Sequence, residues 1–94
     1  MSDREIFGPL MTTEEIRAVV KHSIARITSI DPQEISDQAS YKDDLKLDSL
    51  TILEIAVDAE YQFKIKIPDG ELGTIRTVED TVRTVQQYLD LGAS

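Results

Sequence analysis

The chain has 94 residues, no cysteine and a single histidine, His22. Ten basic residues stand against 18 acidic ones, which gives a formal net charge of −8 and a pI near 4.4. This length predicts one domain, and the lack of cysteine excludes a disulfide scaffold, a thiolate metal site and a cysteine nucleophile. The acidity argues against nucleic acids and anionic membranes as partners and favours basic proteins. We therefore expect a monomeric partner-binding module without catalytic residues or a metal site.

The first eleven residues contain Gly8-Pro9 and show no apolar periodicity. We expect them to form a flexible leader to a domain of residues 12–91. The chain starts without the apolar segment of a signal peptide, and no apolar run approaches the ~18 residues of a membrane-spanning helix. A cytoplasmic, free-standing chain is the corresponding expectation.

The first predicted helix begins at residue 12 or 13, because Thr12 and Glu15 have the spacing of a capping box. Its apolar residues recur at intervals of three and four, as on one buried face of a helix; they are Ile16, Val19, Val20, Ile24 and Ile27. The helix should end near residues 28–29, since Pro32 follows Asp31 and disfavours a helical residue before it. One helical turn from Pro32 and a long ordered loop over residues 36–48 should come next.

The C-terminal half predicts two more long helices and a short one. The second helix covers residues 49–63, and the short third helix covers residues 68–72. Between them, residues 64–67 alternate like a strand but have no partner, so we expect an extended linker. The last helix should begin at Thr77, spaced as in a capping box, and end before Gly92. The predicted fold is all-α, a small antiparallel four-helix bundle with a long loop between the first two helices.

The second helix carries two apolar stripes on a wheel of ~100° per residue. One stripe is by itself wide enough to pack against the core, and it comprises Ile52, Ile55, Ala56, Ala59 and Phe63. The other comprises Leu50, Leu53 and Val57, and it is flanked by Glu54, Asp58, Glu60 and Tyr61. Either the helix has an unusually wide buried face, or the second stripe is an exposed docking strip rimmed by carboxylates.

Asp48 and Ser49 stand at the start of this helix, where backbone amides lack partners and the helix dipole is positive. A serine at this place commonly caps the helix. The same place suits a phosphate esterified to the serine hydroxyl, because helix N-termini stabilise anions. The two residues alone leave both interpretations open.

Several short motifs surround this serine at a characteristic spacing. Tyr41 precedes the pair Asp44-Leu45, and the triplet Asp48-Ser49-Leu50 opens the second helix. Farther along the chain stand Ile67-Pro68-Asp69 and Thr77-Val78-Glu79-Asp80. Together these motifs resemble the attachment-site segment and the following helices of acyl carrier proteins, and the resemblance covers about residues 12–89.

The resemblance implies that Ser49 accepts 4′-phosphopantetheine from coenzyme A, with Asp48 and Leu50 beside it, and that an acyl group rides as a thioester on the terminal thiol. A chain without cysteine would thus import its thiol on a cofactor. The implied partners are a phosphopantetheinyl transferase and acyl-loading and ketosynthase-type enzymes with basic docking patches. The positions that match the family's partner surface are Asp48, Leu53, Glu54, Val57, Glu60 and Tyr61.

Some positions depart from the family pattern. Lys46 stands where glycine is usual. If the loop needs a positive φ there, lysine adds strain or the loop takes another shape. Lys46 would also place a cation beside the phosphate. Thr51 and the pair Tyr61-Gln62 replace residues that are often acidic in fatty-acid carriers. This less acidic helix favours a dedicated polyketide or specialised lipid pathway over general fatty-acid biosynthesis.

Two other functions remain open at this point. An aminoacyl- or peptidyl-type carrier would use the same attachment serine, although Asp48 before the serine favours the acyl type. An unmodified acidic helical module would carry no cofactor and would dock a partner through Leu53, Glu54 and Val57.

Overall fold

The computed structural model describes residues 12–93, with side chains for residues 12–90. It contains four α-helices: α2 (Thr13–Thr28), α3 (Ser49–Phe63), α4 (Asp69–Leu72) and α5 (Val78–Ala93). One turn of 3₁₀ helix covers Pro32–Glu34. The predicted all-α fold, with three long helices and a short one, is confirmed. The predicted leader, residues 1–11, lies outside the described residues.

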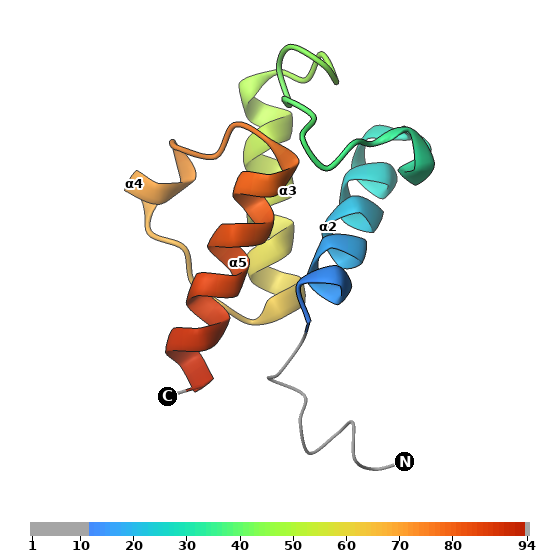
Figure 1. Cartoon of the computed structure of the whole chain (residues 1–94). Coiled ribbons are helices and arrows are strands. Elements are labelled where there is room, and N and C mark those ends of the chain that lie inside the picture. The colour runs from blue at the N-terminus through green and yellow to red at the C-terminus, as the bar shows by residue number, and fades with distance from the viewer. Residues whose placement is uncertain (1–11, 94) are drawn as a thin grey trace.

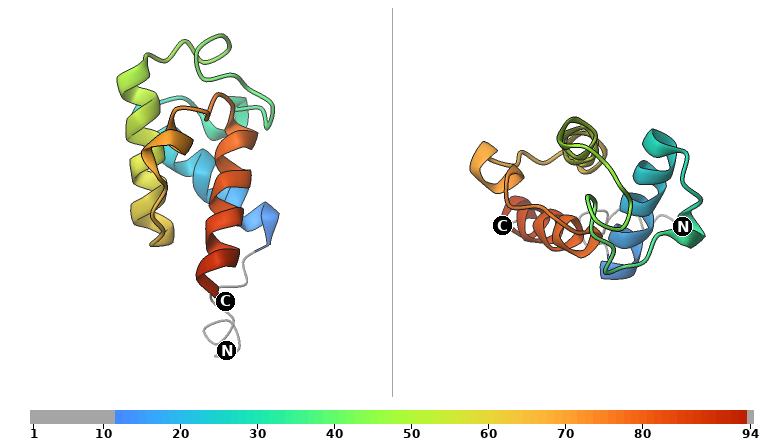
Figure 2. Two further views of the ribbon diagram at one scale, coloured as in Figure 1. Left: turned by 90° about the vertical axis from the view of Figure 1, so that its left-hand side faces the viewer. Right: turned by 90° about the horizontal axis from the view of Figure 1, so that it is seen from above.

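The three long helices lie side by side around one core, and α4 lies at the edge of the bundle (Figures 1 and 2). α2 runs antiparallel to α3, whereas α3 and α5 run in the same direction (Figure 1). This arrangement arises because residues 64–68 and α4 carry the chain back along the bundle before α5 begins. The linker forms no strand, as predicted, and its first residue, Lys64, has a left-handed backbone with φ 58°.

The ends of α2 match the capping signals in the sequence. The Thr12 hydroxyl oxygen accepts a hydrogen bond from the Glu15 amide at 3.1 Å, and the Glu15 carboxylate accepts one from the Thr12 amide at 2.9 Å. At the other end, Ser29 has a φ of 69°, and its amide donates to the Ala25 carbonyl at 2.7 Å. The predicted helix bounds are therefore confirmed at both ends.

The start of α5 also follows its capping signal, but its end does not. The Thr77 hydroxyl oxygen accepts from the Asp80 amide at 3.0 Å, and the Asp80 carboxylate accepts from the Thr77 amide at 3.1 Å. The prediction that this helix ends before Gly92 is wrong, because α5 continues to Ala93. Glycine permits the left-handed conformation that ends a helix but does not impose it.

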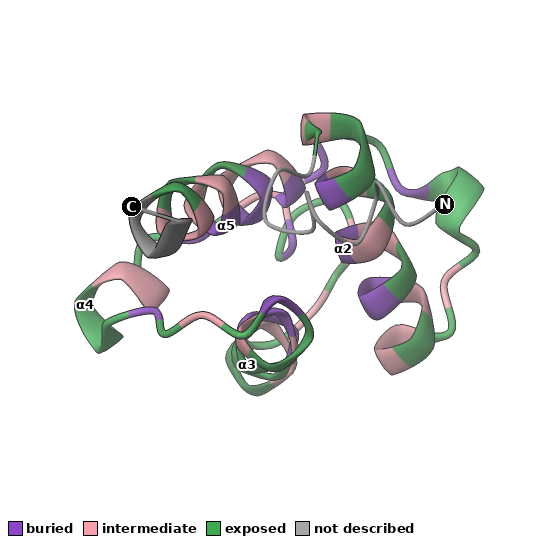
Figure 3. Ribbon diagram, turned by 90° about the horizontal axis from the view of Figure 1, so that it is seen from below, coloured by how far each residue is buried: buried purple, intermediate pink, exposed green. Residues whose placement is uncertain are grey.

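The core lies between the long helices, and the long loop before α3 contributes to it. The buried residues of α2, α3 and α5 lie on the sides of these helices that face the middle of the bundle (Figure 3). From the loop segments, Ile35, Ala39 and Tyr41 are buried as well. Burial of Tyr41 raises the pKa of its hydroxyl to about 12, although the neighbouring Thr81 hydroxyl opposes part of this rise. The loop that leads to α3 is thus part of the folded core.

Candidate functional site

The start of α3 is capped by Asp48. Its backbone is extended, with φ −88° and ψ 173°, and its carboxylate accepts a hydrogen bond from the Thr51 amide at 2.8 Å. This bond to the Thr51 amide holds the pKa of Asp48 below its usual value, because it stabilises the ionised form. Asp48, and not Ser49, therefore fulfils the capping role that the sequence left open.

Ser49 is the first residue of α3, and its side chain is exposed. Within the described part of the chain, no group forms a hydrogen bond with its hydroxyl. The Asp48 carboxylate accepts the Thr51 amide, and the Asp48 carbonyl accepts the Ile52 amide. The amides of Ser49 and Leu50 are therefore left to bind an anion at the positive end of the helix dipole. These features fit a phosphate ester on the Ser49 hydroxyl.

The loop before α3 is tied to the segment between α4 and α5. Tyr41 donates its amide to the Arg76 carbonyl at 2.9 Å, and Ser40 forms an isolated antiparallel bridge with Thr77. The Leu47 amide then closes the loop onto the Tyr41 carbonyl at 2.8 Å. The loop that leads into α3 is therefore positioned by hydrogen bonds to a segment about 35 residues farther along the chain, which local sequence patterns cannot reveal.

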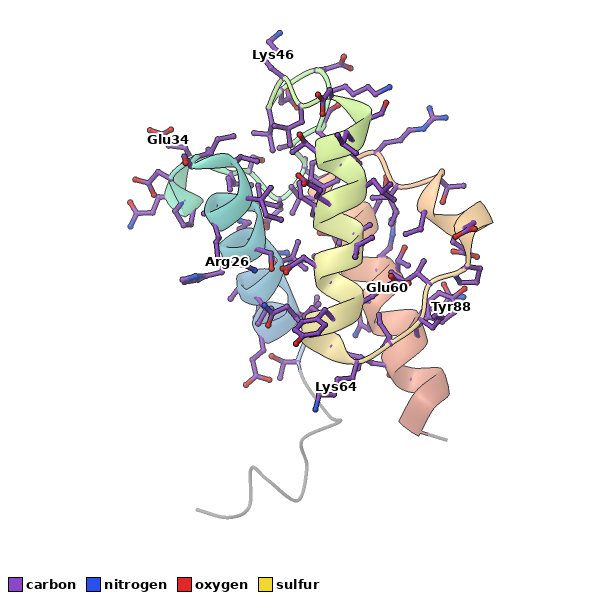
Figure 4. The ribbon with its side chains drawn as sticks, turned by 180° about the vertical axis from the view of Figure 1, so that it is seen from behind. Arg26, Glu34, Lys46, Glu60, Lys64 and Tyr88 are labelled. Carbon is purple, nitrogen blue, oxygen red and sulfur yellow. The ribbon has the colours of Figure 1, made fainter. Side chains whose placement is uncertain are left out.

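Lys46, close to the serine in this loop, adopts a φ of 59°. The positive φ that the sequence raised for this position is therefore present. It lies in the left-handed region that glycine enters without cost, so we expect lysine to be strained there. The Lys46 side chain extends away from the bundle (Figure 4).

A cavity of about 850 Å³ opens beside Ser49. It is bounded by the start of α3, the loop before it, α4, and the segment after α4. Its lining residues are Ser40, Lys42, Asp43, Ser49, Ile52, Leu53, Asp69, Leu72, Gly73, Ile75 and Arg76. The cavity combines apolar side chains with charged groups of both signs, so it suits a ligand that has polar and apolar portions. Neither the cavity nor its basic residues were predicted from the sequence.

The two stripes of α3 differ in exposure. The stripe predicted to face inward is buried, apart from Ile52, which is half-buried. The second stripe is exposed, with accessible fractions of 67% for Leu50, 44% for Leu53 and 47% for Val57, and Tyr61 at 81% continues it. The outer side of α3 is accordingly exposed in Figure 3. The alternative of a wide buried face is therefore wrong, and an exposed apolar strip of this kind is compatible with a docking face.

The acids beside this strip have different roles. Glu54 is exposed and forms no ion pair among residues 12–90. Asp58 is paired with Arg26 of α2 at 2.8 Å. Glu60 is half-buried and faces the linker, where its carboxylate accepts a hydrogen bond from the Ile67 amide at 2.6 Å (Figure 4). The structure therefore gives Glu60 a role within the fold that the sequence did not predict.

The comparisons with known proteins agree with this geometry. The family described as "Phosphopantetheine attachment site" matches residues 18–85. The meromycolate extension acyl carrier protein of Mycobacterium leprae is 44% identical over 77 residues, which cover 82% of this chain and 67% of that protein. The chain belongs to the acyl carrier proteins. A second member, the acyl carrier protein of Rhodococcus erythropolis, is 40% identical over 82 residues, covering 87% of this chain and 90% of that protein.

A solved structure supports the same assignment. The apo doublet acyl carrier protein from prodigiosin biosynthesis matches with a TM-score of 0.71 and 30% identity over 79% of this chain. The matched part is 36% of the doublet's length, so the chain spans about a third of that protein.

Family membership decides between the functions that the sequence left open. The chain is an acyl carrier protein that bears 4′-phosphopantetheine, and it is a carrier, not an enzyme. This role requires interaction with a modifying transferase and with biosynthetic enzymes. None of the helices in the described part of the chain has the length and apolar character needed to cross a membrane.

Proposed function

We propose that Ser49 is the attachment residue and that the loaded protein carries acyl groups in a dedicated lipid pathway. The observation that carries this proposal is the exposed Ser49 hydroxyl, which has no partner among the described residues and lies beside a cavity at the start of α3. A hydroxyl that served the fold would be engaged in the cap, whereas Asp48 fulfils that role here.

In loading, the Ser49 hydroxyl oxygen bonds to the pantetheine-side phosphorus of coenzyme A as the P–O bond of the pyrophosphate linkage breaks. Adenosine 3′,5′-bisphosphate leaves, and the hydroxyl proton is released. When bound, the group supplies a thiol at the end of an arm, which this cysteine-free chain does not itself possess. The amides of Ser49 and Leu50 and the dipole of α3 stabilise the added phosphate, while Asp48 holds the first turn in place.

We also propose that the exposed strip of α3 is the docking face for the transferase and for acyl-loading and ketosynthase-type enzymes. Leu53 and Val57 supply apolar contact area, and Glu54 supplies an exposed carboxylate beside them. Residues 43–60 hold six acids and one lysine, a net charge of −5 out of −8 for the whole chain. Such a field accelerates the approach of basic surfaces and weakens with salt.

The expected site of action is the cytoplasm.

The pathway assignment is supported by the names of the relatives. Proteins that are 44% identical to this chain are named for meromycolate extension. The helix that carries the docking strip has Thr51 and Tyr61-Gln62 in place of acids usual in fatty-acid carriers. We infer a specialised lipid as the cargo, and the mass of the native acyl group is the measurement that identifies it.

Intact-mass measurement tests the attachment residue. The protein is incubated with coenzyme A, Mg²⁺ and a broad-specificity phosphopantetheinyl transferase, and the mass is expected to rise by one phosphopantetheine. Ser49→Ala should show no gain, whereas Ser36→Ala, an exposed serine in the same loop, should load normally. A mass gain in folded Ser49→Ala would place the group on another residue.

The docking face is tested by a charge reversal at Glu54. Glu54→Lys is expected to slow loading at low salt, because it inverts the free carboxylate beside the strip. Glu34→Lys makes the same charge change on the exposed 3₁₀ turn, away from α3 (Figure 4), and serves as the matched control. Equal rates for the two variants at low salt would show that the enzyme does not approach this face.

A further inference from the structure

We propose that Lys42 and Arg76 hold the phosphate of the arm and direct the arm into the cavity between α3 and α4. This inference rests on the proposed attachment at Ser49. The first observation is placement: Ser49, Lys42 and Arg76 line the same cavity. The two cations come from separate segments that the hydrogen bond from the Tyr41 amide to the Arg76 carbonyl holds side by side.

The second observation is that both cations are available. Within residues 12–90, four other basic residues form ion pairs, namely Arg17, Lys21, Arg26 and Arg83. Neither Lys42 nor Arg76 pairs with a carboxylate in this part of the chain, although Asp43 and Asp69 line the same cavity. Both side chains are exposed and so are free to turn toward an anion.

The backbone of Arg76 is fixed even though its side chain is free. Its carbonyl accepts the Tyr41 amide, and its own amide donates to the Asp80 carboxylate at 3.0 Å. The guanidinium therefore projects from a rigid base, which lowers the entropy lost when it binds. Arginine also presents paired N–H groups that match two oxygens of a phosphate.

The charge around Ser49 explains why cations are needed there. A phosphate on this serine adds negative charge next to Asp48 and near Asp43 and Asp44, in the most acidic part of the chain. Two unpaired cations on the cavity wall offset this repulsion. Because the phosphate is covalently tethered, its effective concentration at the cavity is high, so weak exposed contacts suffice to hold it.

Nuclear magnetic resonance on the loaded protein tests this inference. The chain has no cysteine, so a nitroxide maleimide reacts only with the thiol of the arm. In the wild type we expect paramagnetic broadening of the amide signals of Leu72, Gly73 and Ile75, which line the cavity. We expect this broadening to be lost, and the ³¹P signal to shift, in the double variant Lys42→Gln with Arg76→Gln.

Lys46→Gln is the matched control, because Lys46 lies in the same loop but its side chain points away from the bundle (Figure 4). It should retain the wild-type broadening and ³¹P shift. Absence of broadening in the wild type, or equal broadening in the double variant, would overturn the inference.

Intact mass, measured first, separates a failure of loading at Ser49 from a failure of the phosphate contact. If the double variant does not load, a salt series on the loaded wild type decides. Broadening should decline as salt screens the two cations, and broadening that does not change with salt would contradict their role.

Discussion

The Tyr41 hydroxyl forms a hydrogen bond with the Thr81 hydroxyl inside the core, 40 residues apart in the chain. The contact joins α5 to the loop that precedes Ser49, and both hydroxyl-bearing residues are fully buried. Together with the hydrogen bond from the Tyr41 amide to the Arg76 carbonyl, this contact fixes the position of the loop relative to α5. The position of the proposed attachment residue therefore depends on contacts that also stabilise the fold.

We expect Tyr41→Phe to lower the free energy of unfolding by about 1 kcal/mol at pH 7, the usual contribution of a buried hydrogen bond. The raised pKa also predicts a change at alkaline pH. Because the folded hydroxyl titrates at about 12 and the unfolded one near 10, its contribution is complete below pH ~10 and is lost as the pH rises toward 12. Urea unfolding at pH 7 to 11 measures both effects. An alkaline limb as steep in Tyr41→Phe as in the wild type would contradict this assignment.

We expect Asp48 to contribute to stability and Ser49 to contribute little to it. Asp48→Ala removes the cap and is expected to cost about 1 kcal/mol of unfolding free energy. Ser49→Ala should change it by less than ~0.5 kcal/mol, because the hydroxyl is exposed and has no partner among the described residues. Thermal or urea unfolding of the unloaded variants checks this. A marked loss in Ser49→Ala would mean that its hydroxyl serves the fold.

Lys46→Gly is expected to stabilise the protein by about 0.5–1 kcal/mol. Lysine at a φ of 59° costs roughly 1–2 kcal/mol relative to glycine, and the greater freedom of glycine in the unfolded chain offsets part of that gain. Lys66→Gly is the control. Lys66 lies in the linker after α3 and has no positive φ, so this variant should only lose stability. Equal destabilisation of the two variants in urea unfolding would show that residue 46 is not strained.

Asp80 should contribute to the loss of stability in acid. Partial burial by itself would raise its pKa, but hydrogen bonds from the Arg76 and Thr77 amides and the Thr77 hydroxyl outweigh this, and the pKa is lowered. A depressed folded pKa contributes stability above the unfolded value of ~3.9, and that stability is lost as the pH falls through the folded pKa.

Asp80→Asn tests this, with an expected cost of about 1 kcal/mol at pH 7 that disappears in acid. Urea unfolding between pH 2 and pH 7 is the measurement. If the difference between Asp80→Asn and the wild type stays constant over that range, Asp80 does not titrate with folding.

Much of the fold could be read from local signals. The capping pairs Thr12 with Glu15 and Thr77 with Asp80 predicted where two helices begin, because a cap involves residues only three apart. The end of α5 was missed, since Gly92 permits a helix end without requiring one.

Part of the site depends on contacts that sequence motifs do not reveal. The Tyr41 bond to Arg76 and the Glu60 bond to Ile67 have no local signature, so the cavity beside Ser49 and the structural role of Glu60 were not predicted. The cations Lys42 and Arg76 are 34 positions apart in the chain, and only the folded loop places them on one cavity wall.

The sequence by itself determined the helices, the attachment motif around Ser49 and the existence of two apolar stripes on α3. Whether Leu53 and Val57 would be covered was decided only by the tertiary structure. The helical period fixes the direction in which each side chain leaves its helix, but the packing of α2 and α5 determines which directions remain exposed. That packing buries one stripe and leaves the other exposed on the surface.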